Sequence, residues 1–200
     1  MVESHLVMHG VAVKKHGTAD AVAALVGLPV ERVAALLETA VAGGRAALAG
    51  GKYLLTPCGR MIVEGQYSRY YAAARADAGM QAAHARFEVV NNELKQVITD
   101  WQTMAVGGQQ VANDHADAAY DERVIDRLGQ VHEKVEPILD AFATVVPRFA
   151  RYKGALEKAL ERAEDGEHAW VSDATLDSYH TVWFELHEDI LRVLGRTREE

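Results

Sequence analysis

The positions of glycine and proline between residues 18 and 60 constrain the fold more than any other feature of this sequence. Gly27 closes one short apolar segment, and Pro29 opens the next. Glycine tolerates the left-handed backbone of a tight helix exit, and proline fits the first turn of a helix, where its missing N–H is not needed. The pattern therefore predicts two short helices, over about 18–26 and 30–42, joined by a tight turn.

The spacing of small and apolar residues around this turn indicates how the two helices meet. Ala23 supplies a small side chain where two steeply crossing helices touch, and Gly27 follows it by four residues. Val33 and Leu36 follow the glycine by six and nine residues and provide apolar anchors on the second helix. This spacing is typical of a helix-turn-helix motif, although two ordinary amphipathic helices around a glycine would give a similar pattern.

A β-hairpin is predicted directly after the second helix. Gly50-Gly51 is a two-residue turn signal, and short strands are expected on either side of it, at 46–48 and 53–55. Thr56 followed by Pro57 is the favoured order for the N-cap and first residue of a helix, so another helix should begin there. The order of helix, turn, helix and hairpin predicts a helix-turn-helix with a wing in residues 1–65.

The return strand of this hairpin lies in the string YLLTPCGRMIVEG, which resembles the end of the wing in MarR-like and other winged-helix regulators. The resemblance covers roughly residues 4–65 and implies a DNA-binding unit in which Arg45 and Lys52 meet phosphates. On the second helix only Arg32 and Thr39 could donate to base edges, whereas Glu31 and Glu38 would face phosphates unfavourably. The predicted DNA contacts are Arg32, Thr39, Arg45, Lys52, Lys14 and Lys15.

Charge is unevenly distributed along the chain. Residues 1–65 carry six Lys/Arg and five Asp/Glu, whereas the rest carries 15 basic and 24 acidic residues. An acidic surface does not collect polyanions, so nucleic-acid contacts are expected only from the N-terminal third. Cys58 is the single cysteine, and the sequence contains neither a signal-peptide pattern nor a long apolar run. We expect a cytoplasmic protein with no membrane partner.

Residues 66–200 are predicted to form an acidic antiparallel helical bundle, which makes the whole chain mainly α. No linker separates it from the N-terminal unit, so the helix that starts at Pro57 is expected to continue to about Met104. A loop should follow over 105–119, in which Asp114, Asp117, Asp121 and His115 are solvated. Apolar residues at three- and four-residue spacing then predict helices over 120–145 and from 147, and a last helix capped by Asp173.

Histidines, aromatic residues and a carboxylate on the inward faces of this bundle suggest a polar ligand pocket. No pair at i, i+3 or i+4 spacing is present to chelate a metal, so no metal or other cofactor is assigned. The alternative is that these histidines flank the core and form local hydrogen bonds. No nucleophile motif is present either, and no catalytic residue is predicted. The candidate ligand-binding residues are Asp100, Trp101, His132, His180, Trp183 and His187.

The favoured interpretation is a non-enzymatic winged-helix transcriptional regulator that binds DNA as a homodimer and senses a small-molecule effector in the bundle. Two other interpretations stay open. The phrases DWQ, AYDERVID and SYHTVWFELHED are similar to a small actinobacterial group that accompanies phosphoenolpyruvate-utilising phosphotransferases, which implies an accessory protein that docks on a partner enzyme. The third is a metal- or ligand-binding bundle with a vestigial wing.

Overall fold

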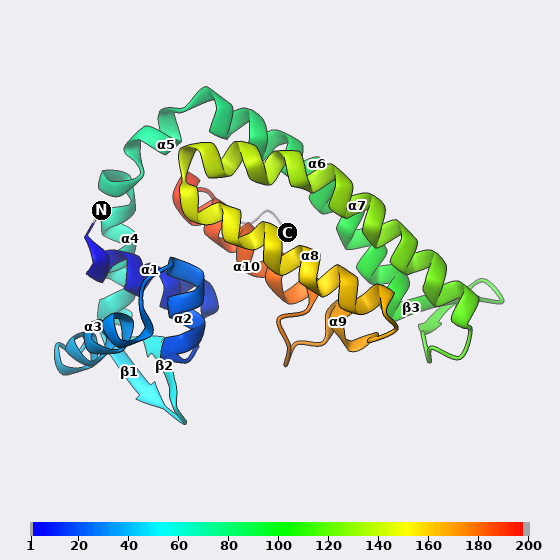
Figure 1. The fold of residues 1–200 in the computed structure, drawn as a ribbon, viewed down its shortest axis with the longest axis horizontal. Helices are drawn as coiled ribbons and strands as arrows, with labels where there is room; N and C mark the ends of the chain where they lie inside the picture. Colours follow the sequence, from blue (N-terminus) through cyan, green and yellow to red (C-terminus); the bar gives the residue numbers. More distant parts are fainter. Residues whose placement is uncertain (1, 198–200) are drawn as a thin grey trace. The chain divides into compact units, whose positions relative to one another are not determined.

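The computed structural model describes residues 2–197 and is mainly helical, with two small antiparallel hairpins (Figure 1). Its contacts divide it into two compact units. The first unit comprises residues 1–76 and 187–200, and the second comprises residues 77–186. The predicted boundary was at residue 65, whereas the first unit also includes residues 66–76 and the part of the last helix that begins at His187. The end of the predicted bundle, residues 198–200, lies outside the described part of the chain.

The first unit begins with three helices whose ends are set by local signals. Thr18 caps α2 by accepting a hydrogen bond from the Ala21 N–H, and Gly27 leaves α2 with φ 75°. Pro29 is the N-cap of α3, and the buried side of α3 consists of Val33, Leu37 and Ala40. The three helices are α1 (Glu3–Lys14), α2 (Ala19–Val26) and α3 (Val30–Ala42).

A hairpin follows α3, formed by β1 (Ala46–Ala49) and β2 (Lys52–Leu55). The strands pair with Ala46 opposite Leu55, and both turn glycines, Gly50 and Gly51, have positive φ, as a type I′ turn requires. Gly17 forms an isolated antiparallel bridge with Tyr53, so the segment between α1 and α2 is hydrogen-bonded to the hairpin. The predicted elements of residues 18–55 are all present.

The long helix predicted from Pro57 to about Met104 is broken in three. Thr56 caps α4 (Pro57–Tyr70), as expected, but α4 ends at Tyr70, with Tyr71 as its C-cap. A short α5 (Ala72–Ala76) follows, and Asp77 then caps α6 (Ala78–Gln102) by accepting a hydrogen bond from the Met80 N–H at 2.8 Å. An aspartate at this position satisfies the free N–H groups of a new helix start, which favours the break over a continuous helix.

The second unit packs α6 against α7 (Ala118–Val145), and α7 against α8 (Ala150–Glu164), around an apolar core (Figure 1). Pro137 lies inside α7 without ending it, as predicted. The core includes the buried rings of Phe87 and Phe142, whose centroids are 6.2 Å apart. A 3₁₀ turn (Pro147–Phe149) joins α7 to α8, and α9 (Ala169–Ser172) and α10 (Tyr179–Leu194) complete the fold.

Two predictions for the second unit were wrong. The predicted loop after residue 105 contains a second hairpin, β3 (Thr103–Val106) and β4 (Gln109–Ala112), which turns at Gly107 and Gly108. The last helix begins at Tyr179, where the Ser178 hydroxyl accepts the Thr181 N–H, and the predicted cap Asp173 instead closes a local turn by accepting the Thr175 N–H.

Candidate functional site

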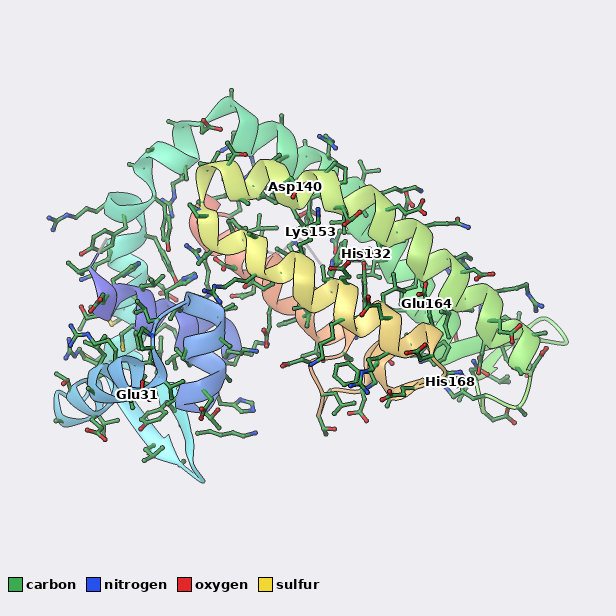
Figure 2. All side chains as sticks on the ribbon, in the orientation of Figure 1. Glu31, His132, Asp140, Lys153, Glu164 and His168 are labelled. Carbon is green, nitrogen blue, oxygen red and sulfur yellow. The ribbon has the colours of Figure 1, made fainter. Side chains whose placement is uncertain are left out.

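One side of α3 is exposed to solvent. Packing of Val33 and Leu37 into the first unit leaves the opposite side of the helix to solvent. The exposed polar residues of α3 are Glu31 (Figure 2), Arg32, Glu38 and Thr39, and its exposed apolar residues are Val30, Ala35 and Ala42. The exposed side therefore carries two carboxylates and one guanidinium, so it presents little positive charge.

The two predicted base readers on α3 both have partners within the protein. The Arg32 guanidinium contacts the Glu3 carboxylate at 2.7 Å, and both side chains are about half exposed. The Thr39 hydroxyl donates to the Ala35 carbonyl of its own helix at 2.8 Å. Exposed ion pairs of this kind contribute little free energy, so Arg32 can exchange its partner at small cost.

The remaining predicted DNA contacts lie on three different elements of the first unit. Arg45 is half-buried and its Nη2 donates to the Thr39 carbonyl at 3.4 Å, near the end of α3. Lys52 is exposed at the start of β2, directly after the hairpin turn. Lys14 ends α1, and the exposed Lys15 follows it with φ 61°.

Of the six predicted ligand-binding residues, His132 and Trp183 share a neighbour, the Tyr179 ring. Asp100 pairs with Arg127 at 2.6 Å, and Trp183 donates its indole N–H to the Asn91 side chain at 3.0 Å. Trp101 packs on His115, His180 is half-buried, and His187 is buried in the first unit. His187 belongs to the first unit, whereas the other five belong to the second.

His132 is buried on α7 and contacts the Tyr179 ring edge-on, with ring centroids 5.9 Å apart. Its Nδ1 lies 3.3 Å from the Tyr179 hydroxyl, and burial lowers the pKa of the imidazole. Glu136, Glu157 and Glu164 oppose that shift, and Glu164 lies on the neighbouring helix α8 (Figure 2). Burial also raises the pKa of the Tyr179 hydroxyl, so the pair is neutral near pH 7.

A buried carboxylate lies where the sequence suggested a solvated acidic loop. Asp121 is 1% exposed, accepts a hydrogen bond from the Asn113 amide at 2.9 Å and contacts His115 at the same distance. His168 is 4.0 Å from the same carboxylate, and Trp101 packs on both imidazoles. The expectation that Asp121 is solvated was wrong, because the turn after β4 directs its partners onto it.

A second polar cluster is buried in the first unit, and the sequence offered only a weak signal for it. His9 Nε2 lies 3.0 Å from the Asp189 carboxylate, and both side chains are fully buried. His9 Nδ1 lies 2.9 Å from the Tyr67 hydroxyl, which also hydrogen-bonds to Arg192. Buried charges need such partners, and the only hint of this site was a histidine among the apolar residues of the first helix.

No family model, curated protein or solved structure matches this chain. Across residues 2–197, no group of three or more His, Cys, Asp or Glu side chains is arranged to hold a metal ion. None of the helices described in that range is long and apolar enough to cross a membrane.

Proposed function

We propose that this chain is a winged helix-turn-helix transcriptional regulator, in which α3 and the β1–β2 hairpin contact DNA. The observation that carries the proposal is the exposed outer face of α3 beside a hairpin with an exposed lysine, Lys52, at its turn. A helix of this kind fits the major groove, and a hairpin lysine at the side of the groove pairs with phosphates.

The positive charges of the first unit suit contact with the phosphate backbone of DNA more than reading of its base edges. Lys15 and Lys52 are exposed, Lys14 is half-buried at the end of α1, and Arg32 joins these cations once it leaves Glu3. Few phosphate contacts per protomer give weak binding, which a homodimer compensates by placing two copies of α3 about 34 Å apart on successive turns of DNA. The proposed mechanism therefore depends on the geometry of a dimer.

The direct test removes cations from the proposed DNA face. The triple variant Arg32→Ala, Arg45→Ala, Lys52→Ala should weaken binding to genomic fragments at moderate salt by more than ten-fold, as measured by fluorescence anisotropy. The control variant Arg123→Ala, Arg151→Ala, Lys158→Ala removes three exposed cations of the second unit and should leave the affinity unchanged. Equal affinities of the two triple variants would exclude this face as the DNA contact.

A change of the opposite sign makes the test sharper. Glu31 and Glu38 are exposed on the proposed reading face, so they repel phosphates if α3 enters the groove. Glu31→Gln with Glu38→Gln should therefore tighten DNA binding, by about three- to ten-fold at low salt. The control, Glu133→Gln with Glu161→Gln on exposed positions of α7 and α8, should have no effect. Weaker binding by the α3 double variant would contradict the proposal.

A second candidate function is docking on a partner protein, without DNA binding. The observation that favours it is exposed apolar surface beside the two carboxylates of α3: Leu48 is 54% exposed, and Val30 and Leu54 are also exposed. Such side chains suit a protein contact better than a phosphate backbone. A folded protein that binds no DNA fragment at 50 mM salt, together with weaker partner binding after Leu48→Ser, would favour this function over the first.

A further inference from the structure

The first unit contains a cavity of about 400 Å³ beside the C-terminal end of α10. Side chains from α4, α5 and α10 line it, and its charged members are three arginines and two glutamates. The volume is at the lower end of the range for small-molecule sites. The residues that the argument uses are Glu64, Tyr67, Arg75, Glu188, Arg192 and Arg196.

Arg192 is the central cation of this cavity. Its Nη2 pairs with the Glu188 carboxylate at 2.7 Å, one turn earlier on α10, and its guanidinium also hydrogen-bonds to the Tyr67 hydroxyl. The side chain keeps 22% of its surface exposed, and its buried Nε–H has no hydrogen-bond partner among the described residues. A buried N–H without a hydrogen-bond partner lowers the stability of the fold, so packing alone does not account for the position of Arg192.

Groups behind Arg192 hold it at the cavity wall. Because burial raises the pKa of Tyr67, its hydroxyl stays protonated, accepts from Arg192 and can donate to His9 Nδ1 at 2.9 Å. His9 Nε2 in turn faces the Asp189 carboxylate at 3.0 Å. This chain of buried polar groups fixes the direction of the Tyr67 hydroxyl and therefore the orientation of the guanidinium.

Arg75 supplies a second guanidinium, fixed by backbone acceptors at the end of α10. Its Nε donates to the Val193 carbonyl at 2.8 Å, and its Nη2 donates to the Arg192 carbonyl at 3.3 Å. Gly195, with φ +69°, lies directly on this guanidinium, where a Cβ would approach the Arg75 Cζ to 2.7 Å. Two positioned guanidinium groups and the exposed Arg196 therefore border one small cavity.

We propose that this cavity binds a small organic oxyanion through Arg192, Arg196 and the wall formed by Arg75. The ligand class is a metabolite-sized molecule with a carboxylate or phosphate group, because guanidinium donors match the geometry of both. Glu64 and Glu188 limit the net positive charge and favour one anionic group over a polyanion. The proposed anion site does not depend on DNA binding, because its argument uses the cavity residues and their contacts and none of the predicted DNA contacts.

The test titrates the full-length protein with inorganic phosphate and, separately, with acetate, at constant ionic strength set with KCl. The arginine Nε–H signals are followed by ¹⁵N NMR. Saturable shifts of the Arg192 and Arg196 signals, with Kd below about 10 mM for at least one anion, are expected. The anion that binds more tightly identifies the head group. Signals that drift without saturation, and to the same extent as the exposed Arg162 of α8, would overturn the proposal.

Two variants distinguish the site from general charge attraction. Arg192→Lys keeps the charge but removes the guanidinium fork, so it should weaken binding at least ten-fold. Arg196→Gln changes an exposed residue at the cavity edge, should leave the fold intact and should weaken binding about three-fold. Thermal melts show whether Arg192→Lys remains folded. If that variant is unfolded, the affinity of Arg196→Gln decides whether the anion binds at the cavity. Unchanged affinity in the folded variants, relative to an Arg162→Gln control, would exclude the site.

Discussion

At the scale of single residues, His132 makes the stability of the second unit depend on pH. Burial beside Tyr179 lowers the pKa of its imidazole, so the folded protein resists protonation at this position more than the unfolded chain does. As pH falls through the unfolded value of about 6.5, the unfolded state takes up the proton first and stability is lost. Above that pH both states are neutral at His132, and the residue has no effect on the pH dependence.

We therefore expect His132→Gln to lose less stability than the wild type between pH 8 and pH 5.5. Glutamine stays neutral over this range and can still hydrogen-bond to Tyr179. Urea unfolding at the two pH values measures the difference. The control is His16→Gln, since His16 is an exposed residue between α1 and α2 and its replacement should keep the wild-type pH dependence more closely. Parallel pH profiles for wild type and His132→Gln would contradict the assignment.

At the scale of elements, Gly59 is the closest contact between α4 and the base of the hairpin. A Cβ at this position would lie 1.8 Å from the Arg45 carbonyl oxygen, which already accepts the Thr56 N–H. Since that obstacle is backbone, Gly59→Ala should destabilise the protein by about 1–3 kcal/mol or more. The matched control in the same helix is Gly65→Ala, which has open space and should stabilise by about 0.5–1 kcal/mol. Shifts of the urea midpoint in the same direction for both variants, relative to wild type, would refute this packing.

Helices and strands could be predicted from the sequence where turn residues and the pattern of apolar residues agreed. Gly50-Gly51 and Gly107-Gly108 form the same kind of turn with positive φ, yet only the first hairpin was predicted. The return strand of the first hairpin, β2, contains Tyr53, Leu54 and the buried Leu55, whereas that of the second, β4, begins with two glutamines and is exposed throughout. Without an apolar face, a strand has no sequence periodicity that distinguishes it from a loop.

The polar clusters were less predictable than the elements because their members are far apart in the sequence. Nothing near His9 indicates that Asp189 will reach it, and the pairing arises only when the end of α10 joins the first unit. For the proposed DNA face the reverse holds: its exposed positions follow from helix periodicity alone. The pairing of Arg32 with Glu3 depended on tertiary packing and was not anticipated.

At the scale of the whole molecule, the acidic surplus belongs to the second unit. Residues 77–186 carry 10 basic and 20 acidic side chains, whereas the first unit carries 11 basic and 9 acidic ones. Under the proposed function, this partition favours phosphate contacts from the first unit over contacts from the second. The predicted cations of the DNA face number five per protomer: Lys14, Lys15, Arg32, Arg45 and Lys52.

If the five cations of the proposed DNA face make all the phosphate contacts, the salt dependence of DNA affinity has an upper limit. Each neutralised phosphate contributes about −0.9 to the slope of log K against log salt, so five cations allow a slope of about −4.5 per protomer at most. Fluorescence anisotropy between 50 and 200 mM KCl measures the slope, and sedimentation under the same conditions gives the number of protomers bound. Removing Arg32, Arg45 and Lys52 should reduce the slope by about 2.7 per protomer. A slope that stays the same in this variant would assign the phosphate contacts to other residues. An affinity independent of salt would show that the protein does not bind the phosphate backbone of DNA.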